Sequence, residues 1–465
     1  MAEAILEAGS ASAVAPKRQL TLFDSTCIIV GIIIGATFYE STPMIAQGSP
    51  SVLAFVGIWV LGGLLSLIGA MCYAELATAY PASGGDYVYL TRAFGRPMGF
   101  VFAWAQLWIV RPGSVGAMAF VFARYADQLL PLGRGNTGLL AYAVGSVVVL
   151  TAINIIGVRE GKWTQNLLTV LKALGVIAIF AVGMLHSAPS TRSAAGTTLA
   201  PISGLQFKLA LIMIFWAYGG WNEMAYVAAE VRNPTRNILR SLVLGTLAVT
   251  LIYALAAIAF VHALGLQQVR TSDAIAADVL RFAGGEWAGR FISALICVTA
   301  LGAINGLIFT GARITYAVGA EHWIYGWFGR WNAKTGTPLR ALIGQAIVTI
   351  ALAVGFARAK NGFTSFVIFE SPVFWVFFLL VGIGFFALRW REPHAPRPYR
   401  VPLYPIVPAL FCLSSAFMAY SSLEYALANR SMEALWSVGI LAVGFALCLV
   451  DRKPATKLDQ VKIDR

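Results

Sequence analysis

Apolar residues fall in runs of about 20 that are separated by short polar stretches, and a helix of that length crosses the hydrocarbon core of a bilayer. No stretch between two runs exceeds roughly 30 residues, so no separate soluble domain is expected. The fold class predicted is an all-α polytopic membrane protein with 12 transmembrane helices. Their ranges are near 20–46, 52–79, 98–130, 139–158, 163–185, 205–230, 238–264, 288–317, 340–357, 363–388, 403–421 and 433–451.

Composition supports this prediction and excludes a soluble protein. Of the 465 residues, 58% are hydrophobic and 12% are charged, with a mean hydropathy of +0.74, whereas soluble domains carry roughly 25% charged residues. The net charge of +13 does not indicate nucleic-acid binding, because Lys and Arg lie at alternate helix ends rather than on one basic face. A cytoplasmic N-terminus places about 22 of them inside and about 9 outside. We expect a multi-pass protein of the plasma (inner) membrane with both termini cytoplasmic.

Residues that could perform catalysis or bind a metal do not cluster. The five cysteines all lie inside apolar runs, where a cysteine acts as a small packing residue. The four histidines are scattered over span ends and loops, and no zinc-protease or phosphate-loop motif is present. We therefore expect no enzyme activity, no cofactor and no metal site.

Two of the predicted spans carry glycines where a membrane helix would break. The first reads CIIVGIIIGATFYESTPMIA, with Gly31 and Gly35 four residues apart. Such a pair also serves close helix packing, and alone it would favour that reading. The sixth reads LALIMIFWAYGGWNEMAYVAAE, with Gly219 and Gly220 adjacent in the middle. Adjacent glycines weaken a helix strongly.

Broken helices at matching positions of two halves are typical of inverted-repeat secondary transporters. The repeats would be helices 1–5 and helices 6–10, each with a break facing one site at mid-membrane. Half-helix ends there offer free N–H groups to a carboxylate and free carbonyls to an ammonium. The predicted divisions are a cytoplasmic tail at 1–19, the two repeats at 20–185 and 205–388, helices 11 and 12 at 403–451, and a cytoplasmic tail at 452–465.

Several motifs occur in a fixed order with the spacing of a membrane protein. In these motifs the chain resembles the amino acid, polyamine and organocation (APC) superfamily, and most closely its L-type amino acid transporter family. The resemblance runs from about residue 20 to about 345. The motifs are GIIIG in the first span, GAMCYAELATAYPASGGDYVYL (69–90), LWIVRPGS (107–114), FWAYGGWN (215–222), EVRNPTRNILRSL (230–242), GAINGLIFTGARITYAVGAEH (302–322) and TPLRALI (337–343).

The resemblance implies alternating access on a LeuT-like five-plus-five inverted repeat, with substrate held by the unwound parts of helices 1 and 6. Trp216 occupies the aromatic position that closes over substrate from outside, although an aromatic there could also merely fill the core. The implied site consists of N–H groups of Ala36, Thr37 and Phe38 for the carboxylate, carbonyls of Ile33, Trp216, Ala217 and Gly219 for the ammonium, and the adjacent Gly35.

Lys172 stands alone in the fifth apolar run, QNLLTVLKALGV. An unpaired ammonium at bilayer depth costs several kcal/mol, and this one is too deep for its stem to reach water easily. In similar transporters a fifth-helix lysine occupies the place of a sodium ion and bridges helix 1 to helix 8. We therefore expect transport without sodium.

The first helix departs from the family, which usually has a Gly-Ser-Gly triplet where this chain has Gly35-Ala36-Thr37. Thr37 could narrow the carboxylate pocket, supply a hydroxyl, or mark a shifted break. Glu40, one turn later, could face the outer vestibule and attract cations, or could simply stabilise the start of the outer half-helix. Arg111 is a second deep charge, which a structural role explains better than a substrate contact.

The expected function is that of a secondary active transporter or exchanger of L-amino acids, neutral ones above all. A polyamine or cationic amine transporter of the same superfamily is the alternative, which Thr37 and Glu40 keep open. In animal relatives a cysteine after helix 3 links to a single-span glycoprotein. The corresponding loop here, LLPLGRGNTGLL, has no cysteine, so no disulfide-linked heavy subunit is expected. The partners are then the amino acid substrate and the lipid bilayer.

Overall fold

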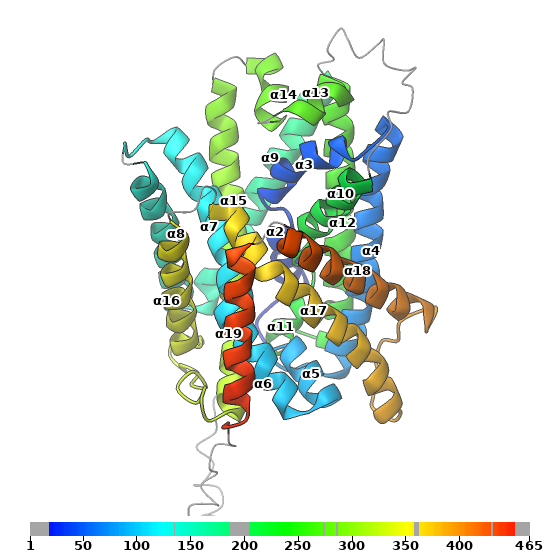
Figure 1. The fold of residues 1–465 in the computed structure, drawn as a ribbon, viewed down its shortest axis with the longest axis vertical. Coiled ribbons are helices and arrows are strands. Elements are labelled where there is room, and N and C mark those ends of the chain that lie inside the picture. The colour runs from blue at the N-terminus through cyan, green and yellow to red at the C-terminus, as the bar shows by residue number, and fades with distance from the viewer. Residues whose placement is uncertain are drawn as a thin grey trace, which may run out of the picture.

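The structure is a computed structural model that describes residues 18–133, 135–185, 204–272, 275–284, 287–357, 362–428 and 431–451. Nearly all of the predicted N-terminal tail and the whole C-terminal tail lie outside the described residues. Within these ranges the chain is helical, with two isolated β-bridges in place of any sheet. Figure 1 shows most of the long helices running along the longest axis, with α2 near the middle of the molecule.

Nine helices in the described residues are long and apolar enough to cross a membrane. One of them, Arg96–Leu129, runs through α6 (Arg96–Ala105), a π-helical turn (Gln106–Val110) and α7 (Arg111–Leu129). The others are α4 (Val52–Ala79), α8 (Asn136–Ile156), α9 (Val158–Leu185), α12 (Pro234–Leu264), α15 (Trp287–Glu321), α16 (Leu339–Phe356), α17 (Gly362–Arg391) and α18 (Ile406–Ala428).

The remaining three predicted spans are helical but differ from a simple span. The first is a bent pair, α2 (Leu22–Ile33) and α3 (Thr37–Gln47), with 51° between the two helices. The sixth consists of short pieces, α10 (Gly204–Ala217), α11 (Glu223–Tyr226) and the 3-10 turn Ala228–Glu230, and the last is α19 (Met432–Cys448), which has 17 residues. The twelve-span inverted repeat thus remains a prediction. Shorter helices lie between spans at α5 (Asp86–Phe94), α13 (Leu266–Thr271) and α14 (Ile275–Gly284).

The N-terminal end of α2 is fixed to α9 by polar contacts. Thr21 and Asp24 form a capping box at the start of α2. Asp24 also pairs with Lys162 at 3.0 Å and accepts a hydrogen bond from Asn166 at 2.7 Å. Further along, a Cβ at Gly31 would overlap side chains of α9. Gly31 therefore serves close packing, and the chain leaves the helix only three residues later.

The start of α2 is also tied to the end of the broken sixth span. The backbone N–H groups of Gln19 and Leu20 donate to the Glu230 carbonyl at 2.8 and 2.9 Å. The Glu230 carboxylate accepts from Arg313 of α15 at 2.7 Å, and both side chains are fully buried. Arg313 also donates to the Phe309 carbonyl and stacks over its ring. One glutamate thus joins both broken spans to α15.

Loss of one partner of this buried pair leaves the other charge unpaired, which costs about 3–5 kcal/mol. Glu230→Gln should therefore lower the melting temperature of the purified protein in detergent by several degrees. Arg281→Ala, which removes the exposed pair with Asp278 at 2.8 Å, is the matched control and should change it little. Equal shifts in the two variants would show that the buried pair does not hold these elements.

Candidate functional site

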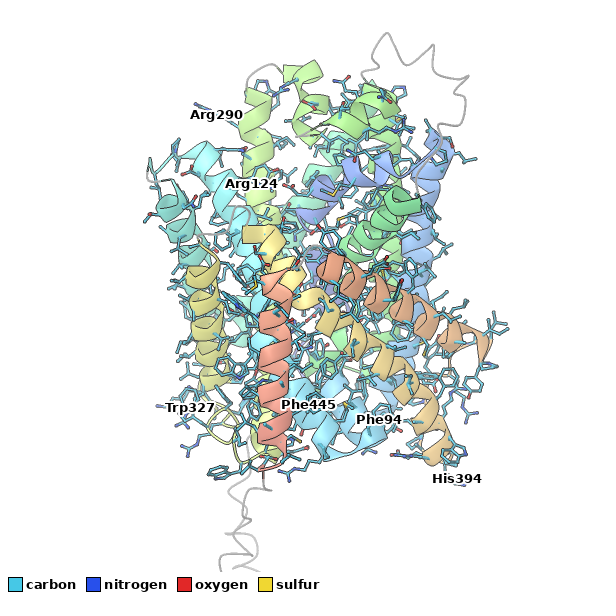
Figure 2. The ribbon with its side chains drawn as sticks, viewed as in Figure 1. Phe94, Arg124, Arg290, Trp327, His394 and Phe445 are labelled. Carbon is cyan, nitrogen blue, oxygen red and sulfur yellow. The ribbon has the colours of Figure 1, made fainter. Side chains whose placement is uncertain are left out.

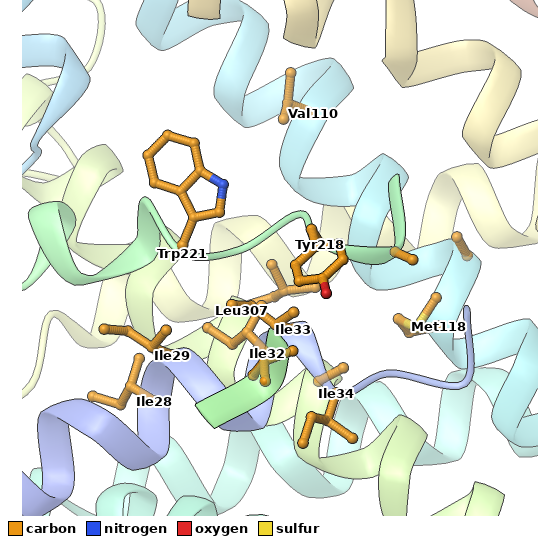
Figure 3. Packing of buried hydrophobic residues seen from close by; sticks show 14 of the residues in the cluster. Ile28, Ile29, Ile32, Ile33, Ile34, Val110, Met118, Tyr218, Trp221 and Leu307 are labelled. Atoms are coloured by element: carbon orange, nitrogen blue, oxygen red, sulfur yellow. The ribbon is translucent and has the colours of Figure 1, made fainter. Parts of the chain in front are cut away.

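Both predicted breaks are present, and they lie against each other. The first covers residues 34–36, between α2 and α3, and the second covers 218–222, between α10 and α11. Gly220 has a φ of +116°, which L side chains rarely adopt, and a Cβ there would come within 2.5 Å of Ile32. Figure 3 shows Ile32, Ile33 and Ile34 beside the turn that carries Tyr218 and Trp221.

Tyr253 of α12 connects the two breaks through its hydroxyl group. It donates to the Ile33 carbonyl at 2.8 Å and lies 3.4 Å from the Ala217 carbonyl. Its ring stacks on Phe38, with ring centroids 4.4 Å apart. One tyrosine therefore satisfies a carbonyl at the end of the first half-helix and lies beside a carbonyl at the end of the other.

A cavity of about 80 Å³ lies between the breaks; we call it the central cavity. Of the eight predicted substrate-binding residues, four line it, namely Ile33, Thr37, Trp216 and Gly219. The rest of the lining includes Glu223, the first residue of α11 after the second break, and residues of three other helices, namely Ser114 and Met118 of α7, Leu307 of α15 and Glu370 of α17. The cavity thus joins both broken spans to three intact helices.

The other four predicted residues, Gly35, Ala36, Phe38 and Ala217, are not among the described residues that line the cavity. Several backbone groups of the predicted site are occupied. The Phe38 N–H donates to the Gly35 carbonyl at 3.3 Å, and the Gly219 N–H donates to the Trp216 carbonyl at 3.1 Å. These groups close the turns at the breaks, so a ligand would have to replace those bonds to reach them.

Lys172 lies behind the first break and is fully buried. Its ammonium donates to the carbonyls of Gly31 at 2.5 Å, Ile34 at 3.0 Å and Thr299 at 3.2 Å. All three donors of the ammonium are thereby used, with two carbonyls at the end of α2 and one on α15. The geometry is that of a cation bound among backbone carbonyls.

A second cavity, of about 270 Å³, adjoins the central cavity. Thr37, Trp216 and Ser371 line both, so these side chains form the partition between them. Glu40 lines the second cavity and pairs with Arg124, while the Tyr125 hydroxyl donates to the same carboxylate at 3.2 Å. Figure 2 shows Arg124 in the upper half of the molecule. Glu40 lies in the first turn of α3 and lines the second cavity, and its carboxylate is already paired with the Arg124 guanidinium.

Sequence reasoning missed the acidic partner of Arg111. Its guanidinium pairs with Glu223 at 2.7 Å and also donates to Gln106 at 3.0 Å and to Thr310 at 3.4 Å. Thr310 in turn donates to Glu223. The π-helical turn directly before Arg111 brings Gln106 within reach of it. Arg111 therefore has a structural partner in the wall of the central cavity, beside the second break.

Glu370 was missed as well, although its signal was visible. It is the one acidic residue of FVIFESPVFWVFF, and a carboxylate inside an apolar run marks a functional position by the same argument as Lys172. Its side chain is buried in the cavity wall and accepts from the Ser114 hydroxyl at 2.7 Å. Among the described residues, no group of three or more His, Cys, Asp and Glu side chains could hold a metal.

Comparison with known proteins agrees with this architecture. A family model described as amino acid permease matches residues 20–447. The mouse (Mus musculus) b(0,+)-type amino acid transporter 1 is 29% identical over 412 residues, covering 86% of this chain and 82% of that protein. The human (Homo sapiens) large neutral amino acids transporter small subunit 2 is 29% identical over 426 residues, covering 90% and 78%. The chain therefore belongs to the amino acid permease family, in agreement with the resemblance that its sequence motifs indicated.

Proposed function

We propose that this protein is a sodium-independent secondary transporter or exchanger of neutral L-amino acids that works by alternating access. The observation that carries the proposal is the central cavity, which lies between two helix breaks and is separated from a second cavity only by Thr37, Trp216 and Ser371. Movement of this partition would open the central cavity to one side. With both termini cytoplasmic in the plasma membrane, the second cavity is the outward one, because α3 follows α2 away from the N-terminus.

The amino acid would bind with its charged groups at the breaks and its side chain toward the cavity wall. The Lys172 ammonium, bound to three carbonyls, supplies the positive charge that a sodium ion would bring. The names of the relatives support amino acids as the substrate class. With no cysteine in the loop between α7 and α8, we propose that no disulfide-linked subunit is required.

The alternative is transport of polyamines or cationic amines. Thr37 and Glu40 kept it open, and the pairing of Glu40 with Arg124 removes the free carboxylate on which the second part of that argument depended. Uptake into proteoliposomes with and without internal amino acid, under competition by alanine, phenylalanine, lysine and putrescine, tests both functions. If putrescine were the one compound of the four that competed, amino acid transport would be contradicted. If amino acid uptake occurred only when the vesicles contained internal amino acid, the protein would be identified as an exchanger.

Trp216 lies partly buried in the partition and should close the site over bound substrate. Trp216→Ala should reduce uptake by roughly tenfold or more, since burial of a large side chain contributes about 1.5–3 kcal/mol. The measurement is initial uptake per reconstituted transporter. Trp390→Ala, at an exposed tryptophan, is the control. Uptake within twofold of the parent would show that Trp216 only fills the core.

Lys172 should make sodium unnecessary, so replacement of sodium by choline should leave uptake by the parent unchanged. Lys172→Ala should slow turnover, because the carbonyls of Gly31, Ile34 and Thr299 then lose their shared donor. Lys334→Ala, in an exposed loop, serves as the control. Loss of uptake in choline would contradict the role given to Lys172.

Thr37 lines both cavities and should restrict substrate size, which favours alanine, serine and threonine over large aromatic amino acids. Thr37→Gly should raise competition by phenylalanine relative to alanine by about 10-fold to 200-fold, the usual effect of a change in pocket shape. Thr37→Ser keeps the hydroxyl and separates size from hydrogen bonding. An unchanged ratio in both variants would place substrate away from Thr37.

A further inference from the structure

Glu370 is a buried carboxylate without a cationic partner among the described residues. It lies on α17, is 4% exposed, and lines the central cavity. Among the described residues it accepts one hydrogen bond, from the Ser114 hydroxyl of α7 at 2.7 Å. Gly113 lets the side chain lie this close to α7, since a Cβ there would come within 2.7 Å of the Glu370 Cβ.

The charged groups that face Glu370 do not neutralise it. They are Arg111 of α7 and Glu223 of α11, which are paired with each other at 2.7 Å and so supply no net cation. Other helices packed on α17 direct their charges elsewhere. Glu75 of α4 pairs with Arg389, and Arg92 of α5 pairs with Glu392. Asp86 of α5 accepts a hydrogen bond from Tyr226, and Glu433 of α19 accepts one from Ser365. Arg340 of α16 donates to the Trp327 carbonyl, and Glu424 of α18 is exposed.

An ionised carboxylate in such a place is unfavourable, because a charge buried without a partner loses its hydration and gains no compensating interaction. Either a proton on Glu370 or a cation from the ligand removes that cost. The ammonium of a neutral amino acid has carbonyls at the breaks as its proposed partners, and its carboxylate would be repelled by an ionised Glu370. A proton on Glu370 removes both the burial cost and the repulsion.

We propose that Glu370 is the proton-binding group of this transporter, so that one proton moves with each neutral amino acid. The inference rests on the proposed function and names its coupling. The proton binds a carboxylate oxygen of Glu370 from the second cavity, is retained while substrate occupies the central cavity, and leaves to the opposite side. Proton and substrate each favour binding of the other, since affinities of two coupled ligands change reciprocally.

Access for the proton is provided by the partition. Ser371 follows Glu370 along the chain and lines both cavities. A proton from the second cavity therefore needs to pass only the partition of Thr37, Trp216 and Ser371 to reach Glu370. Opening of the partition thus admits the amino acid and the proton at the same step, which is the requirement for coupling.

The test uses the full chain reconstituted in proteoliposomes at equal internal and external sodium. An inward pH gradient of one unit should drive alanine above equilibrium in the parent, up to a limit of about tenfold for one proton, and alanine addition should acidify the lumen. Glu370→Gln should lose gradient-driven accumulation and lumen acidification to a much larger extent than it loses alanine counterflow at symmetric pH. Glu370→Asp, which keeps a titratable carboxyl group, should retain part of both.

Glu433→Gln, an acid of α19 outside the cavity, is the matched control and should keep full coupling. Gradient-driven accumulation that persists in Glu370→Gln, or a parent that shows counterflow without any response to the gradient, would overturn the proposal and leave the proposed function intact. Selective loss of lysine transport in Glu370→Gln would also overturn it, by making Glu370 a contact for a cationic substrate. Absence of amino acid counterflow in the parent would instead overturn the proposed function itself.

Discussion

The structure depends on one constraint, which is that backbone groups freed by a helix break must find partners where water is excluded. The break at residues 34–36 leaves carbonyls at the end of α2 without helical donors. Lys172 serves those of Gly31 and Ile34, and Tyr253 serves that of Ile33. Because these donors come from α9 and α12, the break is stable only while those helices stay packed against α2.

This dependence explains why small residues and polar ties gather around α2. Gly31 lets α9 approach closely enough for the Lys172 stem to reach the break. Asp24 fixes the register of α2 on α9 through Lys162 and Asn166. The Lys172 contact with Thr299 then extends the same arrangement to α15. The site is thereby positioned by rigid helices, although its own backbone is irregular.

Sequence reasoning located the breaks, because adjacent glycines and a lone lysine in apolar runs are local signals. Thr37 and Trp216, which the resemblance named as site residues, line the central cavity, and their contact with substrate stays a prediction. It could not find the partners of Arg111, Glu40 or Glu230, since those pairs join residues 83 to 112 positions apart. Such pairings follow from helix packing, which local pattern does not encode.

Three buried acids near the breaks, Glu230, Glu223 and Glu370, differ in what neutralises them, and this separates their roles. Glu230 and Glu223 are each paired with an arginine at 2.7 Å. Protonation of either carboxylate would leave its arginine unpaired in the protein interior, which costs several kcal/mol. Glu370 has a serine hydroxyl instead. A hydroxyl can donate to an ionised carboxylate or accept from a protonated one, whereas an arginine can only donate. Of the three, Glu370 alone can therefore change its protonation state without breaking an ion pair, and it lines the central cavity next to Ser371 of the partition.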